Sequence, residues 1–128
     1  MYITREVEAT IDSYLKQGKV VLVTGTRQVG KATTLKQHLG DAFSYVSLEN
    51  PAEFVTAKQD SVPFFEEHSL PLIIDEVQRV PELFSPIKWQ ADQSDAKGQI
   101  VLTGSQTYQT NEPYMVTRDV QAVPVWAI

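Results

Sequence analysis

A glycine-bounded loop that ends in a lysine is the segment of this chain with the clearest chemistry. It reads Gly25, Thr26, Arg27, Gln28, Val29, Gly30, Lys31. This order fits the pattern G-x-x-x-x-G-K, in which glycines let the backbone turn tightly and direct several N–H groups at one point. The N-terminus of a following helix adds positive potential, and the lysine reaches the outer phosphates. We interpret residues 25–31 as a cradle for the phosphates of a nucleoside triphosphate.

The residue after the lysine breaks the pattern. A serine or threonine is typical there, because its hydroxyl ligates the Mg²⁺ that bridges the β and γ phosphates, and this chain has Ala32. Thr33 does not simply replace it, since one step along a helix rotates the side chain by about 100°. Mg²⁺ normally keeps several waters, so a water can take the position. We expect nucleotide binding to survive, with a looser metal and impaired hydrolysis.

Two carboxylates follow an apolar run and form the second candidate group. Asp75 and Glu76 come directly after Leu72-Ile73-Ile74. At the carboxyl end of a parallel strand, Asp75 would hold a magnesium-bound water, and Glu76 would orient the attacking water and accept its proton. The alternative interpretation is that the two acids begin a solvated turn.

A third group ends another apolar run, IVLTGS. Its small polar residues, Thr103 and Ser105, are candidates for contacting the γ-phosphate or the attacking water. The alternative is again an ordinary turn.

Apolar runs and helical patterns alternate along the chain, and they are the elements that must position these groups. Strands are predicted within residues 19–25, 43–49, 70–76 and 99–105, each run being short and mostly apolar. Helices are predicted over residues 4–17, 31–39, 51–58, 62–67 and 81–93, the last becoming regular at Ser85 and Pro86. Residues 106–119 are expected to be loop or weak helix, and Pro124 places the last run at a sheet edge or a break. The alternation predicts one α/β domain over residues 1–128, a three-layer sandwich around a parallel sheet.

Composition limits the classes of partner and compartment. The chain has 128 residues, 42% of them hydrophobic, a formal net charge of -5 and no cysteine. The negative charge disfavours nucleic acid and anionic membrane as main ligands, and the missing cysteines exclude disulfides and thiol catalysis. No apolar run reaches membrane-spanning length, so we expect a soluble, cytoplasmic protein.

Four further residues of interest are expected to be structural. His38 and His68 have no second ligand at metal-binding spacing, and Trp89 and Trp126 are expected to pack against the sheet.

Four segments carry a resemblance to a known family. GTRQVGKATTL, YVSLENP, LPLIIDEVQRVPELFSPIKWQAD and GQIVLTGSQ resemble, in order and spacing, prokaryotic AAA-type P-loop ATPases with an N-terminal ATP-binding domain and a C-terminal domain of unknown function. The likeness covers about residues 1–106. It implies a P-loop NTPase fold with a five-stranded parallel sheet in the order 5-1-4-3-2.

The same resemblance implies the role of each site residue. Residues 25–33, from Gly25 to Thr33, would bind phosphate, with Lys31 on the β and γ phosphates and Thr33 near the α-phosphate. Asp75 would help to hold Mg²⁺, Glu76 would activate water, and Thr103 or Ser105 would act as sensor. Three further matching residues, Gln78, Arg79 and Pro81, receive no role.

The chain departs from the family at two places. The family has threonine where this chain has Ala32, and residues 107–128 diverge from its usual continuation, so the sequence is either an excised domain or a truncated, divergent relative. The leading hypothesis is an ATP-binding domain that hydrolyses ATP slowly, or only when a protein partner or a second copy supplies missing groups. One alternative is a non-hydrolysing nucleotide sensor or scaffold, and another is a protein-interaction fragment with a vestigial phosphate site.

Overall fold

The computed structural model describes residues 9, 12–16, 18–25, 31–93, 95–105 and 120–124, with backbone only at 24, 25, 31–34, 105 and 120–124. Its elements are, in chain order, β1 (Val20–Gly25), α2 (Lys31–Leu39), β2 (Ser44–Ser47), α3 (Pro51–Gln59), α4 (Ser61–Glu67), β3 (Leu72–Asp75), the 3₁₀ turns η2 (Val77–Arg79) and η3 (Pro81–Leu83), α5 (Phe84–Asp92), β4 (Ile100–Ser105) and β5 (Val120–Pro124). Strands and helices alternate as the sequence pattern predicts.

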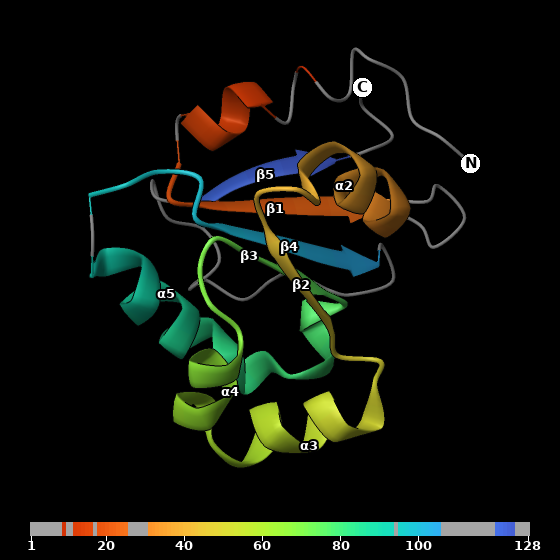
Figure 1. Ribbon diagram of the computed structural model, residues 1–128, viewed down its shortest axis with the longest axis vertical. Coiled ribbons are helices and arrows are strands. Elements are labelled where there is room, and N and C mark those ends of the chain that lie inside the picture. Colours follow the sequence, from red (N-terminus) through yellow and green to blue (C-terminus); the bar gives the residue numbers. More distant parts are fainter. Residues whose placement is uncertain are drawn as a thin grey trace.

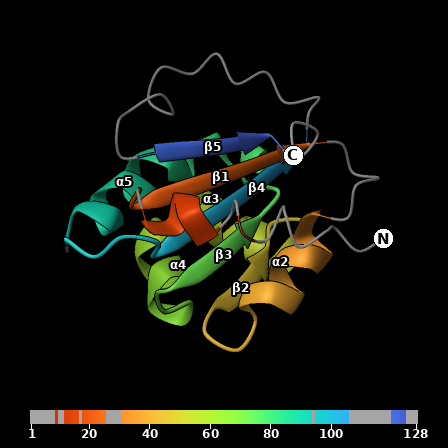
Figure 2. The same ribbon diagram turned by 90° about the horizontal axis from the view of Figure 1, so that it is seen from above.

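The five strands form one sheet in the order β2-β3-β4-β1-β5, which Figure 2 shows from above. Every pair is parallel, with Val20 opposite Ile100 at the start of the β1–β4 pair and Leu72 opposite Ile100 in the β3–β4 pair. The predicted fold class and strand order are therefore confirmed. Strand β5 lies at one edge of the sheet beside β1, and Pro124 is its last residue. This agrees with the prediction, because proline has no backbone N–H to donate to a neighbouring strand.

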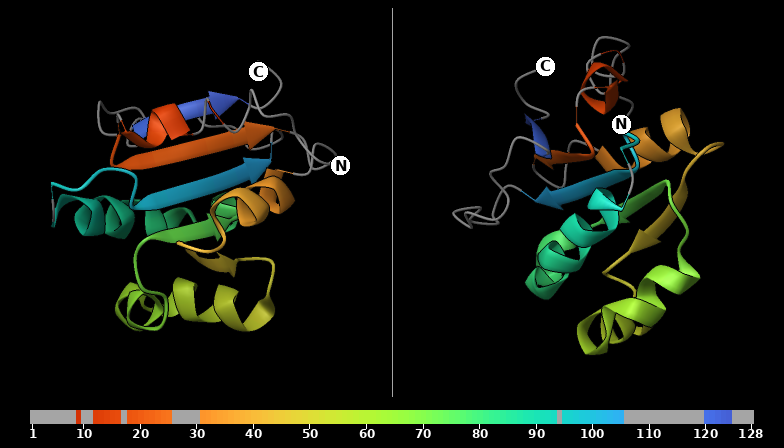
Figure 3. Two further views of the ribbon diagram at one scale, coloured as in Figure 1. Left: turned by 45° about the horizontal axis from the view of Figure 1, so that its top comes forward. Right: turned by 90° about the vertical axis from the view of Figure 1, so that its left-hand side faces the viewer.

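Apolar side chains fill both faces of the sheet, because residues along each strand point alternately to either side. One face packs under α2 through Val21, Val23, Leu35, Leu39, Ile73 and Val101. The other face packs against α3, α4, η2, η3 and α5, with Phe64, Leu83 and Ile87 among its buried residues. The sheet is thus the middle of three layers, with α2 on one side and α3, α4 and α5 on the other (Figures 1 and 3).

Helices α3 and α4 begin where the sequence supplies capping side chains. Asn50 accepts a hydrogen bond from the backbone N–H of Ala52 at 2.9 Å, and Pro51 opens α3. Asp60 does the same for α4, accepting from the N–H of Val62 at 3.0 Å. Each cap satisfies a backbone donor that the first helical turn leaves unpaired.

The structure differs from the sequence interpretation at two points in α5. The regular helix starts at Phe84 and not at Ser85, because the 3₁₀ turn η3 leads directly into it. Trp89 is 61% exposed, so the expectation that it packs on the sheet is wrong. The buried stripe of α5 runs through Phe84, Ile87 and Ala91, and Trp89 lies outside that spacing.

Several sequence predictions fall outside the described residues. These are most of the predicted helix over 4–17, the segment 106–119, and Trp126. Within the described part, Asp12–Lys16 are helical and the N–H of Gly18 bonds the carbonyl of Tyr14 at 3.0 Å, which agrees with a helix that ends at Gly18.

Candidate functional site

The carboxyl ends of three strands and the start of one helix meet at the same edge of the sheet. Gly25, the first residue of the predicted cradle, pairs in register with Ser105 on β4. Helix α2 begins at Lys31, so the chain crosses from the strand end to the helix within residues 26–30. Thr26 to Gly30 lie outside the described residues, and for Lys31, Ala32 and Thr33 only the helical backbone is described. The contacts of residues 25–33 with phosphate therefore stay predictions from the sequence.

The charge pattern of α2 suits an anion at its N-terminus. Its first turn has no acidic residue, and Lys36 and His38 lie in its last turn. A helix N-terminus carries partial positive charge and unpaired N–H groups, while basic side chains are favourable at the opposite end. The helix that follows the cradle therefore offers its positive end to a ligand.

Asp75, Glu76 and Thr103 form a buried cluster at this edge. Asp75 and Thr103 follow Ile73 and Val101 by two residues on adjacent parallel strands, so both side chains lie on the α2 face of the sheet. The Thr103 hydroxyl donates a short hydrogen bond to Asp75 Oδ1 and accepts the backbone N–H of Glu76 at 3.0 Å. The three residues are 0–7% exposed. Burial and mutual bonding speak against a solvated turn.

Thr103 thus holds the two acidic residues in place. The resemblance implies that it contacts nucleotide as a sensor, and that contact stays a prediction. Ser105 is placed beside Gly25 by the backbone register alone.

Tyr45 on β2 holds the second oxygen of Asp75. Its hydroxyl donates to Asp75 Oδ2 at 2.7 Å, and the Lys36 ammonium lies 4.4 Å from the centre of its ring. Burial, followed by the hydrogen bond to Asp75, raises the pKa of Tyr45 above its usual value. The hydroxyl therefore stays protonated at neutral pH and acts as a donor. Each oxygen of Asp75 accepts one side-chain hydroxyl, and α2 is linked to β3 through the tyrosine ring.

Glu76 has an unusual backbone conformation. Its φ of 58° and ψ of 49° lie in the left-handed region, which non-glycine residues rarely adopt. Such conformations are held by surrounding structure and cluster at functional sites. Here the N–H is fixed by Thr103, and Gln78 Nε2 donates to Glu76 Oε1 at 2.5 Å.

The donor set fits a magnesium ion only in part. A carboxylate has about four lone-pair positions, so the two hydroxyls leave Asp75 able to accept from metal-bound water. Mg²⁺ is commonly held by one or two carboxylates together with waters and substrate phosphates. Ala32 offers no oxygen. Asp75 is thus the one group of this cluster suited to a magnesium-bound water, and its role in holding Mg²⁺ stays a prediction.

Each of the two histidines contacts a carboxylate that does not belong to the acidic cluster. His38 Nε2 lies 2.9 Å from Asp12 Oδ1, and His68 Nε2 lies 2.8 Å from Glu53 Oε1. Glu67 joins the second pair, and the three potential ligand atoms lie within 4.8 Å of one another. Sequence spacing missed this group because Glu53 belongs to α3, whereas Glu67 ends α4 and His68 is the residue after it.

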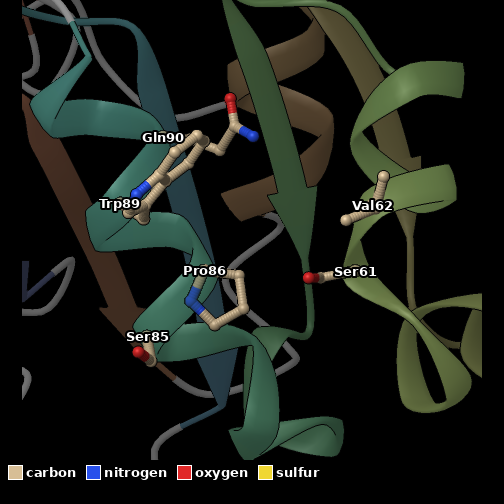
Figure 4. A pocket seen from close by; sticks show the side chains of 6 residues that line it. All are labelled: Ser61, Val62, Ser85, Pro86, Trp89 and Gln90. Carbon is tan, nitrogen blue, oxygen red and sulfur yellow. The ribbon is translucent and has the colours of Figure 1, made fainter.

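A groove between α4 and α5 lies on the opposite side of the sheet from Asp75. Figure 4 shows its lining, which comprises Ser61 and Val62 from α4 and Ser85, Pro86, Trp89 and Gln90 from α5. It contains none of the predicted site residues. None of the helices in the described ranges is long and apolar enough to cross a membrane.

Sequence reasoning missed Tyr45 and gave Gln78 no role. The signal for Tyr45 was weak, because a tyrosine within YVS reads as an ordinary strand residue. Its relation to Asp75 depends on the β2–β3 register, in which Tyr45 pairs with Ile73 and Ser47 pairs with Asp75. A long side chain reaches such a diagonal neighbour on the same face.

Comparisons with known proteins agree with this geometry. The chain is 32% identical over 103 residues to two uncharacterized proteins, Rv2008c of Mycobacterium tuberculosis and Mb2031c of Mycobacterium bovis. The match covers 79% of this chain, which spans only 23% of either relative. The fold is similar to the structure of Caenorhabditis elegans PCH-2, with a TM-score of 0.53 and 16% identity over 98% of this chain and 42% of that one. The model of an AAA domain family matches residues 17–122, and the chain therefore belongs to this family as a nucleotide-binding AAA-type domain.

Proposed function

We propose that this domain binds ATP through residues 25–33 and hydrolyses it slowly, or only when a protein partner completes the site. The observation that carries the proposal is the buried cluster of Asp75, Glu76 and Thr103 at the carboxyl edge where Gly25 pairs with Ser105 and α2 begins. A phosphate cradle and an acidic strand end are the two parts that phosphoryl-transfer sites of this kind require.

We assign the roles of the residues from the sequence motifs and the family resemblance. Lys31 and the backbone of residues 25–33 bind the phosphates, with Thr33 near the α-phosphate. Bound Mg²⁺ would neutralise charge on the outer phosphates, and Asp75 would hold it through water. Glu76 orients the attacking water and accepts its proton.

Ala32 makes hydrolysis the weak step. Without a hydroxyl at this position, one magnesium ligand is lost from the protein, so the ion and the γ-phosphate are held less rigidly. A partner can supply a missing cationic group, as an arginine finger does when it stabilises charge in the transition state. The curated relatives are more than four times as long as the matched region, so in those proteins other regions of the chain are available to supply such a group.

Thermal unfolding with and without ATP tests the binding claim. At 100 times the dissociation constant, a ligand stabilises the folded state by about 2.7 kcal/mol. We expect ATP to raise the melting temperature and Lys31→Ala to remove the shift. Lys97→Ala is the matched control, because Lys97 is exposed and precedes the amino end of β4. A melting temperature that ATP leaves unchanged in the parent would contradict the proposal.

A non-hydrolysing nucleotide sensor is the second candidate, and Ala32 is the observation that favours it. Phosphate release by the parent and by Ala32→Thr separates the two. If the site is a weakened ATPase, Ala32→Thr raises the rate, and adding Glu76→Gln removes the gain. A sensor releases no phosphate in either form while still binding ATP. A vestigial site would bind neither ATP nor ADP at millimolar concentration.

A further inference from the structure

The side chain of Gln78 is committed to Glu76. Its Nε2 donates to Glu76 Oε1 at 2.5 Å, and this is the hydrogen bond that its amide makes within the described part of the chain. Its Oε1 is buried and has no hydrogen-bond partner among the same residues. A glutamine on a 3₁₀ turn at the surface would normally turn both ends of its amide towards solvent.

The orientation of this amide follows from the carboxylate beside it. The reverse orientation would set a carbonyl oxygen against a carboxylate oxygen at 2.5 Å, which is repulsive. A buried carbonyl without a donor is itself unfavourable. The bond to Glu76 therefore holds the amide in this orientation.

Gly104 provides the space in which the amide lies. A Cβ built on Gly104 would come within 3.0 Å of Gln78 Oε1 and 3.9 Å of its amide carbon. The first distance is closer than ordinary contact, so a larger residue would displace the end of the Gln78 side chain. Gly104 belongs to β4 and pairs with Thr24 of β1, one residue before the predicted cradle.

We propose that Gln78 is the positioning residue for the Glu76 carboxylate, and that Gly104 is small so that the Gln78 amide can reach it. Glu76 is then fixed twice, at its backbone N–H by Thr103 and at its side chain by Gln78. This inference rests on the proposed function, because it assigns Gln78 and Gly104 to the step in which Glu76 acts on water.

A double-mutant cycle on phosphate release tests the proposal. The variants are Gln78→Ala, Gly104→Ala and the double variant, each compared with the parent and each repeated with Ala32→Thr. A shift of a catalytic group by about 1 Å can reduce turnover by about 100-fold, and we take this as the upper limit of the expected loss. We expect each single variant to slow turnover and the double variant to be no slower than Gln78→Ala alone. ATP affinity should stay within about twofold, because the bond affects the chemical step and not binding.

Gln93→Ala is the matched control for loss of an amide. Gln93 Nε2 donates to the backbone carbonyl of Trp89 at the end of α5. Its removal should leave turnover unchanged. The proposal would be overturned if Gln78→Ala kept the turnover of the parent. It would also be overturned if the loss in the double variant equalled the product of the losses in the two single variants.

Melting temperatures of the same variants test the contact without using activity. Alanine is generally more stable than glycine in a strand, so Gly104→Ala should raise the melting temperature once Gln78 is alanine. With Gln78 present, the displaced amide should reduce or reverse that gain. Equal effects in both backgrounds would refute the contact.

The outcomes separate this inference from the proposed function. If ATP raises the melting temperature but no variant releases phosphate, ATP binding stands and the role of Gln78 is refuted. If ATP gives no shift in any variant, the proposed function fails, and the role of Gln78 fails with it.

Discussion

Replacing Thr103 with valine should destabilise the domain strongly, although the two side chains have nearly the same shape. Thr103 is fully buried, and its hydroxyl joins Asp75 to the backbone N–H of Glu76. Valine suits a strand, so the change removes the hydroxyl and leaves local packing nearly intact.

The magnitude follows from the two hydrogen bonds. Bonds to charged groups contribute about 1.5–3 kcal/mol, and a buried donor left without an acceptor costs about 1–3 kcal/mol. The two contributions are not fully additive, because the same hydroxyl makes both bonds. We expect a loss of about 2–4 kcal/mol in the free energy of unfolding. For a domain of this size the melting temperature should fall by on the order of 10 °C.

Urea denaturation and calorimetry measure this loss. Thr56→Val is the matched control, because the Thr56 hydroxyl bonds the carbonyl of Ala52 within α3 and belongs to no cluster. That control should change stability by less than about 0.5 kcal/mol. If Thr103→Val were equally mild, the Thr103 hydroxyl would not be what holds Asp75 and Glu76 in place.

Three further predictions concern the scaffold. Leu35→Ala should cost about 2–5 kcal/mol, because Leu35 is fully buried between α2 and the sheet, whereas Val62→Ala at a 60% exposed position should cost little; urea denaturation compares them. Asn50→Ala should cost about 1 kcal/mol through loss of the α3 cap, measured by thermal unfolding, and an unchanged melting temperature would contradict the capping contact. Tyr45→Phe should cost about 1–3 kcal/mol, because it removes one donor from buried Asp75; stability equal to the parent would show that Thr103 alone suffices.

Local pattern predicted the scaffold of this domain well. β1, β3 and β4 are buried on both faces, so their sequences are continuous apolar runs that are hard to confuse with other elements. Helix α2 matches its predicted range because glycine bounds it and two leucines fall on one face. The acidic strand end was also predictable, since Asp75 and Glu76 directly follow such a run.

The side-chain contacts between different strands could not be predicted from local sequence patterns. The bonds from Thr103 and Tyr45 to Asp75 depend on which strands are neighbours and in what register, and neither is encoded in any one segment. The burial of Trp89 was predicted wrongly. Tryptophan is usually buried, but Trp89 does not lie on the face of α5 that packs on the sheet. The left-handed conformation of Glu76 has no local signal, since glycine is the residue that would normally reveal it.

The position of β1 gives the folding of this domain an unusual order of events. β1 is the earliest strand of the sheet in the chain, yet both of its hydrogen-bonding neighbours, β4 and β5, come at least 75 residues later, from Ile100 and Val120 onwards. During synthesis this strand, with its apolar side chains, leaves the ribosome long before either partner exists. Pairing across such separations is slow, and an unpaired strand is prone to associate with other chains. The strand that precedes the predicted cradle therefore stays without its sheet neighbours until the later part of the chain has been made.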